Sequence, residues 1–332
     1  MRPRAAPLNP SPPHRPPQAC STTAAELLAW RRRLLQLGGQ RVDLDWLLEM
    51  VGGLDWATLQ RLRLDPQRTV TLAVPPQQLE QLWQRHCRSA EPLQYLAGLC
   101  PWRDFTLAVA PGVLIPRQET EVLVELAVEL TASRPPRAWA DLGTGSGCLA
   151  VALAHCWPRS RGWAVDCSDL ALAQARGNLQ AAGVAGRVEL LQGGWWQPLQ
   201  PWWGLLELVV ANPPYIPTAV WAELEPVVRD HEPVLALDGG VDGLEAIRAI
   251  VGGACEALAP GGLLLLEHHH DQSPAVQALL HAAELEAVAA HPDLEGVSRF
   301  ASARRPGGPI ADPDGAIAAA APAALVTVPL QA

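Results

Sequence analysis

Apolar residues in the first part of the chain recur at the spacing of an amphipathic helix. Between residues 21 and 90 they fall three or four positions apart, and the first such set ends just before Gly38 and Gly39. Further helices are predicted at Leu44–Met50, Ala57–Leu64 and Gln77–Cys87. Such a helical domain serves either for packing alone or for gripping a partner.

After Pro116 the pattern changes to buried strands that alternate with helices. The predicted strands are Ala138–Leu142, Gly162–Val165, Val188–Leu191, Leu206–Ala211 and Leu263–Glu267, and the predicted helices are Cys148–Cys156, Leu170–Ala182 and Leu244–Leu258. Strand and helix in alternation predict an α/β fold with a doubly wound sheet. Ligands of such sheets bind at the carboxyl ends of the strands.

These patterns divide the chain into five parts. Short alternating stretches between Gln94 and Leu114, broken at Pro111 and Gly112, predict a β-hairpin. The terminal segments are rich in Pro, Gly and Ala without apolar periodicity, which is typical of disorder. The predicted parts are a disordered extension (1–20), a helical domain (21–92), a hairpin linker (93–116), the sheet domain (117–305) and a disordered tail (306–332).

Composition argues against a membrane protein, a zinc protein and a non-specific nucleic-acid-binding protein. Apolar residues make up 49% of 332 residues, enough for a large core, yet every apolar run is far shorter than the roughly 20 residues of a membrane span. The seven cysteines lack the C-x-x-C spacing of a zinc site, so no metal is expected and a reducing cytoplasm fits best. The net charge of −9 disfavours sequence-independent binding of nucleic acid.

A glycine loop follows the first predicted strand of the sheet. It reads Asp141-Leu-Gly143-Thr144-Gly145-Ser-Gly147 and opens a helix, so its backbone can approach a nucleotide-type cofactor closely. The spacing differs from the G-x-G-x-x-G that cradles a pyrophosphate. A cationic sulfonium needs no phosphate cradle, and Asp141 could oppose its charge directly or through water. Asp166 ends the next strand, where it could accept both ribose hydroxyls of an adenosine or merely cap the following helix.

The most specific motif is Asn212-Pro213-Pro214-Tyr215, directly after the strand Leu206–Ala211. The two prolines fix the backbone, so the Asn212 side-chain oxygen and the Pro213 carbonyl can both accept protons from one planar NH2 group. Tyr215 could stack on that amide or base. A plain proline-rich turn would explain the rigidity but neither Asn212 nor Tyr215.

The glycine loop together with Asn-Pro-Pro-Tyr resembles methyltransferases that act on amide or exocyclic NH2 groups. Within that group, the chain resembles the release factor glutamine methyltransferases, the HemK family, from roughly Leu27 to Arg304. The segments that carry the resemblance are Gln94–Gly98, Val113–Glu121, Glu232-Pro233, Leu237, Gly239-Gly240, Asp242–Leu244 and Asp293–Arg299.

This resemblance implies a seven-stranded methyltransferase sheet, S-adenosyl-L-methionine as cofactor, and the glutamine of the Gly-Gly-Gln loop of peptide chain release factors as substrate. The helical domain would help to engage the release factor. The implied catalytic residues are Asn212, Pro213 and Tyr215, joined by Pro214 for substrate binding. The implied cofactor-binding residues are Asp141, Gly143, Thr144, Gly145, Gly147, Asp166, Trp195 and Asn212. The segment Arg117–Glu121 would border the active site, or simply begin a helix.

The chain departs from the family pattern at three places. Gln118 stands where the family usually has proline, and Gly194 stands where a carboxylate before Trp195 often contacts the adenine. Trp195 could still pack near that ring. His268-His269-His270 replaces a glycine-containing stretch; three consecutive histidines cannot all face one metal ion, so we expect a solvated turn.

Three other functions are weighed against glutamine methylation. A nucleic-acid amino methyltransferase would use the same planar chemistry on a flipped base, but the acidic charge and the segment Ile115–Glu121 disfavour it. A ribosomal-protein glutamine methyltransferase is a close variant. A catalytically silent protein that holds a translation factor would need neither Asn212–Tyr215 nor Asp141–Gly147.

Overall fold

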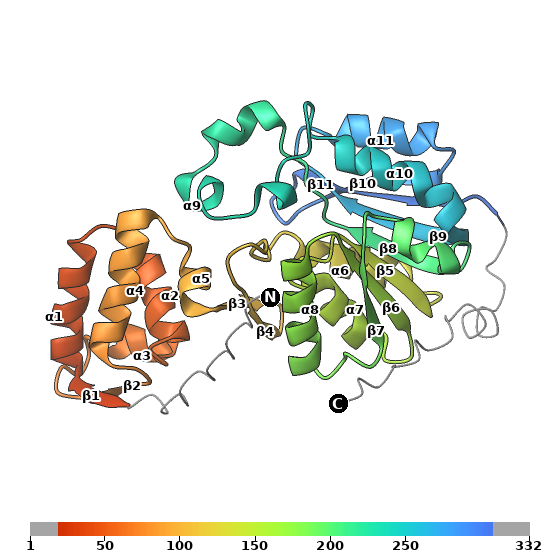
Figure 1. The fold of residues 1–332 in the computed structure, drawn as a ribbon. Coiled ribbons are helices and arrows are strands. Elements are labelled where there is room, and N and C mark those ends of the chain that lie inside the picture. Colours follow the sequence, from red (N-terminus) through yellow and green to blue (C-terminus); the bar gives the residue numbers. More distant parts are fainter. Residues whose placement is uncertain (1–18, 308–332) are drawn as a thin grey trace, which may run out of the picture. The chain divides into compact units, whose positions relative to one another are not determined.

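The computed structural model describes residues 19–307, which form two compact units (Figure 1). The first unit ends at Ala97 and the second begins at Gly98. The predicted disordered extension and tail lie outside the described residues, except for residues 19–20 and 306–307. Of the extension, Cys20 is the first residue of a strand, because it pairs with Leu72 of the helical unit.

The first unit packs its helices around a core of leucine and tryptophan. Its helices are α1 (Ala24–Leu35), α2 (Arg41–Met50), α3 (Trp56–Arg61), α4 (Pro76–Ser89) and α5 (Leu93–Ala97). Thr23 and Glu26 form a capping box that starts α1. The fully buried indole of Trp83 in α4 donates to the Leu34 carbonyl at 3.0 Å, which ties α4 to α1.

The first unit contains two short strands besides its helices. Strands β1 (Cys20–Thr23) and β2 (Thr69–Leu72) pair antiparallel in a two-stranded sheet. Each has only four residues, β1 carries no apolar alternation, and the partners are remote in sequence. The short helix α5 begins at Leu93, within the segment predicted as linker.

The second unit begins with a hairpin of β3 (Leu99–Trp102) and β4 (Phe105–Ala108). A seven-stranded sheet follows, in the order β10-β11-β9-β8-β5-β6-β7. Its strands are β5 (Ala138–Leu142), β6 (Arg161–Asp166), β7 (Val188–Gln192), β8 (Leu206–Ala211), β9 (Leu258–Glu267), β10 (Glu286–Pro292) and β11 (Ser298–Arg304). Strand β11 runs antiparallel to β9 and β10, whereas β5 to β9 are parallel.

Helices cover both faces of this sheet in two layers (Figure 1). One layer holds α6 (Glu121–Leu130), α7 (Cys148–Cys156) and α8 (Asp169–Ala181). The other holds the 3-10 helix η1 (Gln197–Trp202), α10 (Glu245–Ala257) and α11 (Ser273–Ala282). Alternate strand residues enter the two cores, since side chains along a strand point to opposite faces. Between β8 and α10 the chain forms η2 (Thr218–Glu223), α9 (Pro226–Arg229) and η3 (Val234–Ala236).

The strand order reverses beside β5. From β5 the chain moves to β6 and β7 on one side, and then crosses to β8 and β9 on the other. This topological switch point leaves a crevice at the carboxyl ends of β5 and β8, which is where doubly wound sheets bind ligands. Over residues 19–307, no helix has the length and apolar character needed to cross a membrane.

Candidate active site

A cavity of about 470 Å³ opens at the carboxyl ends of the parallel strands. This volume lies in the range of ordinary small-molecule sites. Its lining draws on the loop after β5, the end of β6, the turn after β7, the segment after β8 and the loop before α6. Lining residues from these elements include Gly143, Thr144, Gly145, Asp166, Gly194, Trp195, Asn212, Pro214, Arg117 and Thr120. The structure therefore brings the predicted glycine loop and the predicted substrate motif to one cavity.

The glycine loop turns the chain from β5 into α7 through left-handed backbone conformations. Gly143, Gly145 and Gly147 have φ angles of 76°, 54° and 82°, which glycine adopts without a steric penalty. A Cβ on Gly147 would lie 3.0 Å from the Cβ of Ala175 in α8, so only glycine allows this close packing. Gly147 serves as the N-cap position of α7 but does not line the cavity.

Asp141 lies beneath the loop and is fully buried. Its Oδ2 accepts a hydrogen bond from Thr144 Oγ1 at 2.6 Å, while its Oδ1 has no partner. Burial is the largest cause that raises the pKa of Asp141 to about 7. Since Asp141 does not line the cavity, it supports the loop from below.

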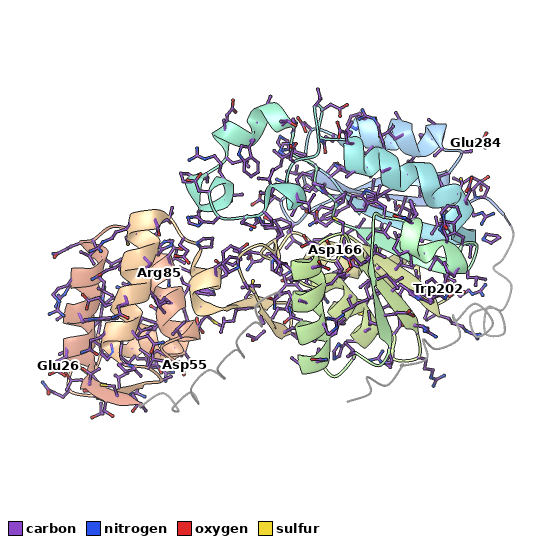
Figure 2. The ribbon with its side chains drawn as sticks, in the orientation of Figure 1. Glu26, Asp55, Arg85, Asp166, Trp202 and Glu284 are labelled. Carbon is purple, nitrogen blue, oxygen red and sulfur yellow. The ribbon has the colours of Figure 1, made fainter. Side chains whose placement is uncertain are left out.

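Asp166 ends β6 with its side chain at the cavity (Figure 2). Its Oδ2 accepts from the Gly145 amide and its Oδ1 from the Ser168 amide, each at 2.9 Å. The cap of α8 is Ser168, whose hydroxyl accepts from the Ala171 amide. Asp166 therefore does not cap that helix, and its remaining lone pairs are available to hydroxyl groups of a ligand.

Trp195 stands at the turn after β7 in a left-handed conformation, with φ of 42°. Its ring lies against Gly143, where an added Cβ would approach within 3.3 Å. Gly194 and Trp195 both line the cavity, so this part of its wall carries a tryptophan but no carboxylate at position 194.

The Asn-Pro-Pro-Tyr segment follows β8. Some of its side chains line the cavity, and the others face the protein interior. Asn212 and Pro214 line the cavity, whereas Pro213 is buried and Tyr215 is directed elsewhere. The Tyr215 hydroxyl donates to Glu267 Oε1 at 3.2 Å. Burial, followed by the charge of Glu267, raises the pKa of Tyr215 above its ordinary value, so the phenol stays protonated.

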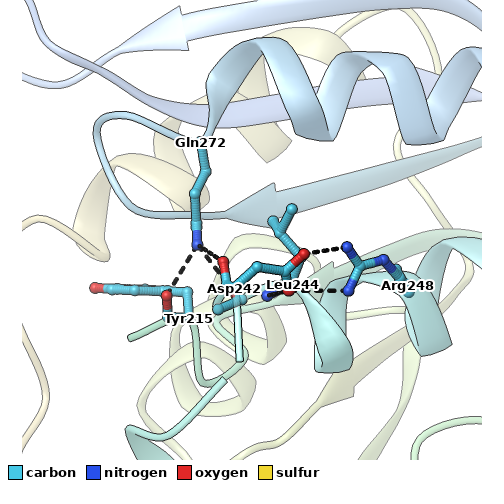
Figure 3. Close-up of polar contacts among 6 residues, drawn as sticks. Tyr215, Asp242, Leu244, Arg248 and Gln272 are labelled. Atoms are coloured by element: carbon cyan, nitrogen blue, oxygen red, sulfur yellow. Dashed lines mark hydrogen bonds and ion pairs between the residues drawn. The ribbon is translucent and has the colours of Figure 1, made fainter. Parts of the chain in front are cut away.

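The backbone at Tyr215 is clamped by Gln272 (Figure 3). The buried Gln272 amide donates to the carbonyl oxygens of Tyr215 at 3.0 Å and Gly243 at 3.1 Å. A Cβ on Gly243 would come within 2.3 Å of the Tyr215 carbonyl oxygen. The Gly243 turn is flanked by an ion pair between Asp242 and Arg248, which lowers the pKa of Asp242 to about 2. The motif thus has a fixed backbone as well as two prolines.

A buried hydrogen-bond network joins Asn212 to the end of β9. Asn212 Nδ2 donates to Thr120 Oγ1 at 2.8 Å, and Thr120 Oγ1 donates to Glu267 Oε2 at 2.7 Å. Both Thr120 and Glu267 are 2% exposed. Burial is the largest cause that raises the pKa of Glu267 to about 7. The sequence placed Thr120 near the site but did not identify Glu267 as a site residue. The one feature that could have indicated it is an acidic residue at the end of an otherwise apolar strand.

A second connection lies beside the cavity. Arg117 lines the cavity and forms an ion pair with Glu232 at 2.7 Å. The buried Glu232 carboxylate also accepts from the Ile115 amide at 3.2 Å. Because these residues lie more than a hundred positions apart, the ion pair joins the loop before α6 to the segment before η3. The segment Arg117–Glu121 thus borders the cavity, and its last residue begins α6.

The three-histidine segment is a solvated turn only in part: His270 is exposed in a turn, whereas His268 is not. His268 is fully buried, and burial lowers its pKa. Its amide donates to the Arg299 carbonyl, which continues the pairing of β9 with β11 beyond Glu267. His269 instead pairs with Asp271 at 2.7 Å. In the part of the chain that the structure describes, no group of three or more His, Cys, Asp or Glu side chains is arranged to hold a metal ion.

Comparison with known proteins gives three kinds of match. Residues 118–224 match the family model described as "Methyltransferase small domain". A release factor glutamine methyltransferase of Prochlorococcus marinus is 49% identical over 86% of this chain and 98% of its own length. A protein of the same name from Bradyrhizobium diazoefficiens is 38% identical over 85% and 94%. The solved hMettl16 catalytic domain, in complex with the MAT2A 3′UTR hairpin 6, has a TM-score of 0.51 at 14% identity, over 70% of this chain and 84% of its own.

Proposed function

The chain belongs to the family of release factor glutamine methyltransferases, and from that membership we propose its reaction and the residues that perform it. The enzyme transfers a methyl group from S-adenosyl-L-methionine to the side-chain amide nitrogen, N5, of the glutamine in the Gly-Gly-Gln loop of peptide chain release factors. The observation that carries the proposal is the Asn212 side chain at the cavity, beside the glycine loop. Since its partner is a translation factor, the enzyme acts in the cytoplasm.

The residues present fit the adenosyl cofactor. The glycine loop leaves the backbone open to the ligand, and Asp166 has lone pairs free for ribose hydroxyls. The Trp195 ring supplies an apolar surface for a base. The buried carboxyl of Asp141, with one oxygen unpartnered, lies beneath the loop where a cationic ligand would bind. S-adenosylmethionine, when bound, supplies an electrophilic methyl group on its sulfonium.

The chain's own residues hold and orient the substrate amide. The Asn212 side-chain oxygen and the Pro213 carbonyl accept its two protons, which fixes the plane of the amide and aligns its nitrogen for attack. These oxygens also stabilise positive charge that develops on the nitrogen. No base is needed at this site, since the proton leaves after methyl transfer. Tyr215 supports this arrangement through its bond to Glu267.

The helical unit of residues 19–97 is proposed to engage the body of the release factor, while the second unit performs the chemistry. This assignment rests on the family and on the substrate-engaging role predicted for residues 21–92. The net charge of −9 supports a protein rather than a nucleic acid as the macromolecule bound.

Mass spectrometry tests the proposal directly. Purified release factor, incubated with the enzyme and S-adenosylmethionine, should gain one methyl group on the glutamine of its Gly-Gly-Gln loop. A release factor with that glutamine replaced by alanine is the matched control and should gain none. Methylation of a ribosomal protein or of nucleic acid, with the release factor untouched, would refute the substrate; absence of cofactor binding by calorimetry would favour a silent scaffold.

A further inference from the structure

The side-chain amide of Asn212 can turn either its oxygen or its NH2 group toward the cavity. Only the oxygen can accept a proton of a substrate amide. We propose that Thr120 and Glu267 are positioning residues that hold the Asn212 oxygen toward the substrate. The inference deepens the proposed function and rests on it, because it concerns the orientation of the group that binds the glutamine amide.

The directions of the hydrogen bonds fix this orientation. Ionised Glu267 has only acceptor atoms, and Thr120 Oγ1 donates its single proton to Oε2 at 2.7 Å. Toward Asn212 the Thr120 oxygen therefore presents lone pairs alone. The group that faces Thr120 at 2.8 Å must be the Asn212 NH2, and the Asn212 oxygen then points to the other side of the amide.

Burial makes the orientation hard to reverse. Thr120 and Glu267 are each 2% exposed, so water is not available to replace a lost partner. To reverse Asn212, the Thr120 hydroxyl would have to turn its proton away from the carboxylate and leave a buried charged oxygen without that donor. The Tyr215 hydroxyl cannot compensate, because it already donates to the other oxygen of Glu267.

Protonation of Glu267 removes this constraint. A neutral carboxyl has a proton to donate, so Thr120 Oγ1 can accept it and turn its own proton toward Asn212. Burial, the largest cause, and the nearby Glu119 raise the pKa of Glu267, while Thr120, Tyr215 and Arg299 lower it, with a result of about 7. Methyl transfer should therefore rise with pH as the carboxylate forms around neutrality.

The kinetic experiment compares three threonine variants of the full-length enzyme. Thr120→Val removes the hydroxyl, whereas Thr120→Ser keeps it and should restore most of the activity. Thr131→Val is the matched control, since Thr131 is also buried and its hydroxyl donates to the Ala127 carbonyl, away from the site. Thr120→Val should lower kcat on release factor about 10- to 100-fold, with cofactor Kd from calorimetry within about twofold. Equal kcat in the Thr120→Val and Thr120→Ser enzymes would overturn the inference.

Two further measurements separate this inference from the proposed function. The side-chain 15N–1H signals of Asn212, assigned by their loss in Asn212→Asp, should shift in Thr120→Val but keep their positions in Thr120→Ser, whether or not glutamine is methylated. In Glu267→Gln the acidic fall of kcat, measured with S-adenosylmethionine saturating at each pH so that Asp141 does not limit cofactor binding, should disappear, because glutamine keeps an oxygen for Thr120 but does not titrate. Unchanged Asn212 signals would refute the positioning, and a persistent acidic fall would refute the role of Glu267. A wild-type enzyme that methylates no glutamine would refute only the proposed function.

Discussion

Replacing Glu267 by glutamine should make the protein more stable at neutral and alkaline pH. The buried carboxyl has its pKa raised from 4.5 to about 7. Between these values the folded protein holds a proton that the unfolded chain has released. The contribution of this group to the free energy of unfolding is therefore fully present below pH 4.5, and it is lost as the pH rises through about 7.

The size of this effect follows from the pKa. A rise from 4.5 to about 7, at 1.36 kcal/mol for each pKa unit, corresponds to about 3 kcal/mol. Glutamine does not titrate, but Thr120 and Tyr215 donate to different oxygens of Glu267. The amide keeps an oxygen at only one of these two positions, which costs about 1 kcal/mol. We expect Glu267→Gln to be less stable than wild type by about 1 kcal/mol at pH 4.5 and more stable by about 2 kcal/mol at pH 8.

Urea unfolding between pH 4.5 and 8 measures this difference. Wild type and Glu267→Gln both contain Asp141, whose raised pKa therefore cancels between them. Glu284→Gln, at an exposed position labelled in Figure 2, gives the effect of losing one surface charge. If the stabilities of wild type and Glu267→Gln stay parallel over this pH range, the argument from burial is refuted.

Three further substitutions test the site. Asn212→Ala should lower turnover at least about 100-fold with cofactor Kd nearly unchanged by calorimetry; full activity would contradict its role. Gln272→Leu removes the amide that holds the Tyr215 and Gly243 carbonyls, so urea unfolding should show a loss of about 1–3 kcal/mol together with a lower kcat; unaltered stability would count against the clamp. Asp166→Asn places an NH2 group against one of two backbone donors and should weaken cofactor binding about tenfold by calorimetry; equal affinity would remove Asp166 from the cofactor site.

The elements predicted best from the sequence are short, mostly apolar segments with a glycine or polar residue at one end or both. Ala138–Leu142, Cys148–Cys156 and Leu206–Ala211 were predicted with the bounds that the structure shows. Arg137 and Gly143 flank the first of these elements, Gly147 precedes the second, and Asn212 follows the third. Strand β1 was missed because its four residues carry no apolar alternation, and its partner β2 lies far along the chain. Local pattern contains no signal for such a pairing.

Some residues of the candidate site could likewise be predicted from the sequence, and others could not. The sequence placed Asn212, Asp166 and the glycine loop at strand ends, and the cavity brings them together because parallel strands end at one edge. Glu267 was missed because its partner Thr120 is 147 positions away. A hydrogen bond between two such residues leaves no periodic trace. That Tyr215 could stack on the substrate stays a prediction, and the structure adds the hydrogen bond from its hydroxyl to Glu267, which the sequence did not indicate.

The buried carboxylate of Glu267 lowers the stability of the fold but orients the Asn212 side chain for catalysis. An apolar residue there would avoid enclosing a carboxylate, and burial of an ionised group opposes folding. It would also leave the Thr120 proton free to point toward Asn212, and the Asn212 NH2 could then face the cavity. We therefore expect the buried acid at the end of β9 to serve the direction of the Asn212 amide. Glu267→Leu should accordingly unfold at higher urea than wild type at pH 8 and turn over more slowly. A variant that gained stability without losing kcat would show that Glu267 serves no such purpose.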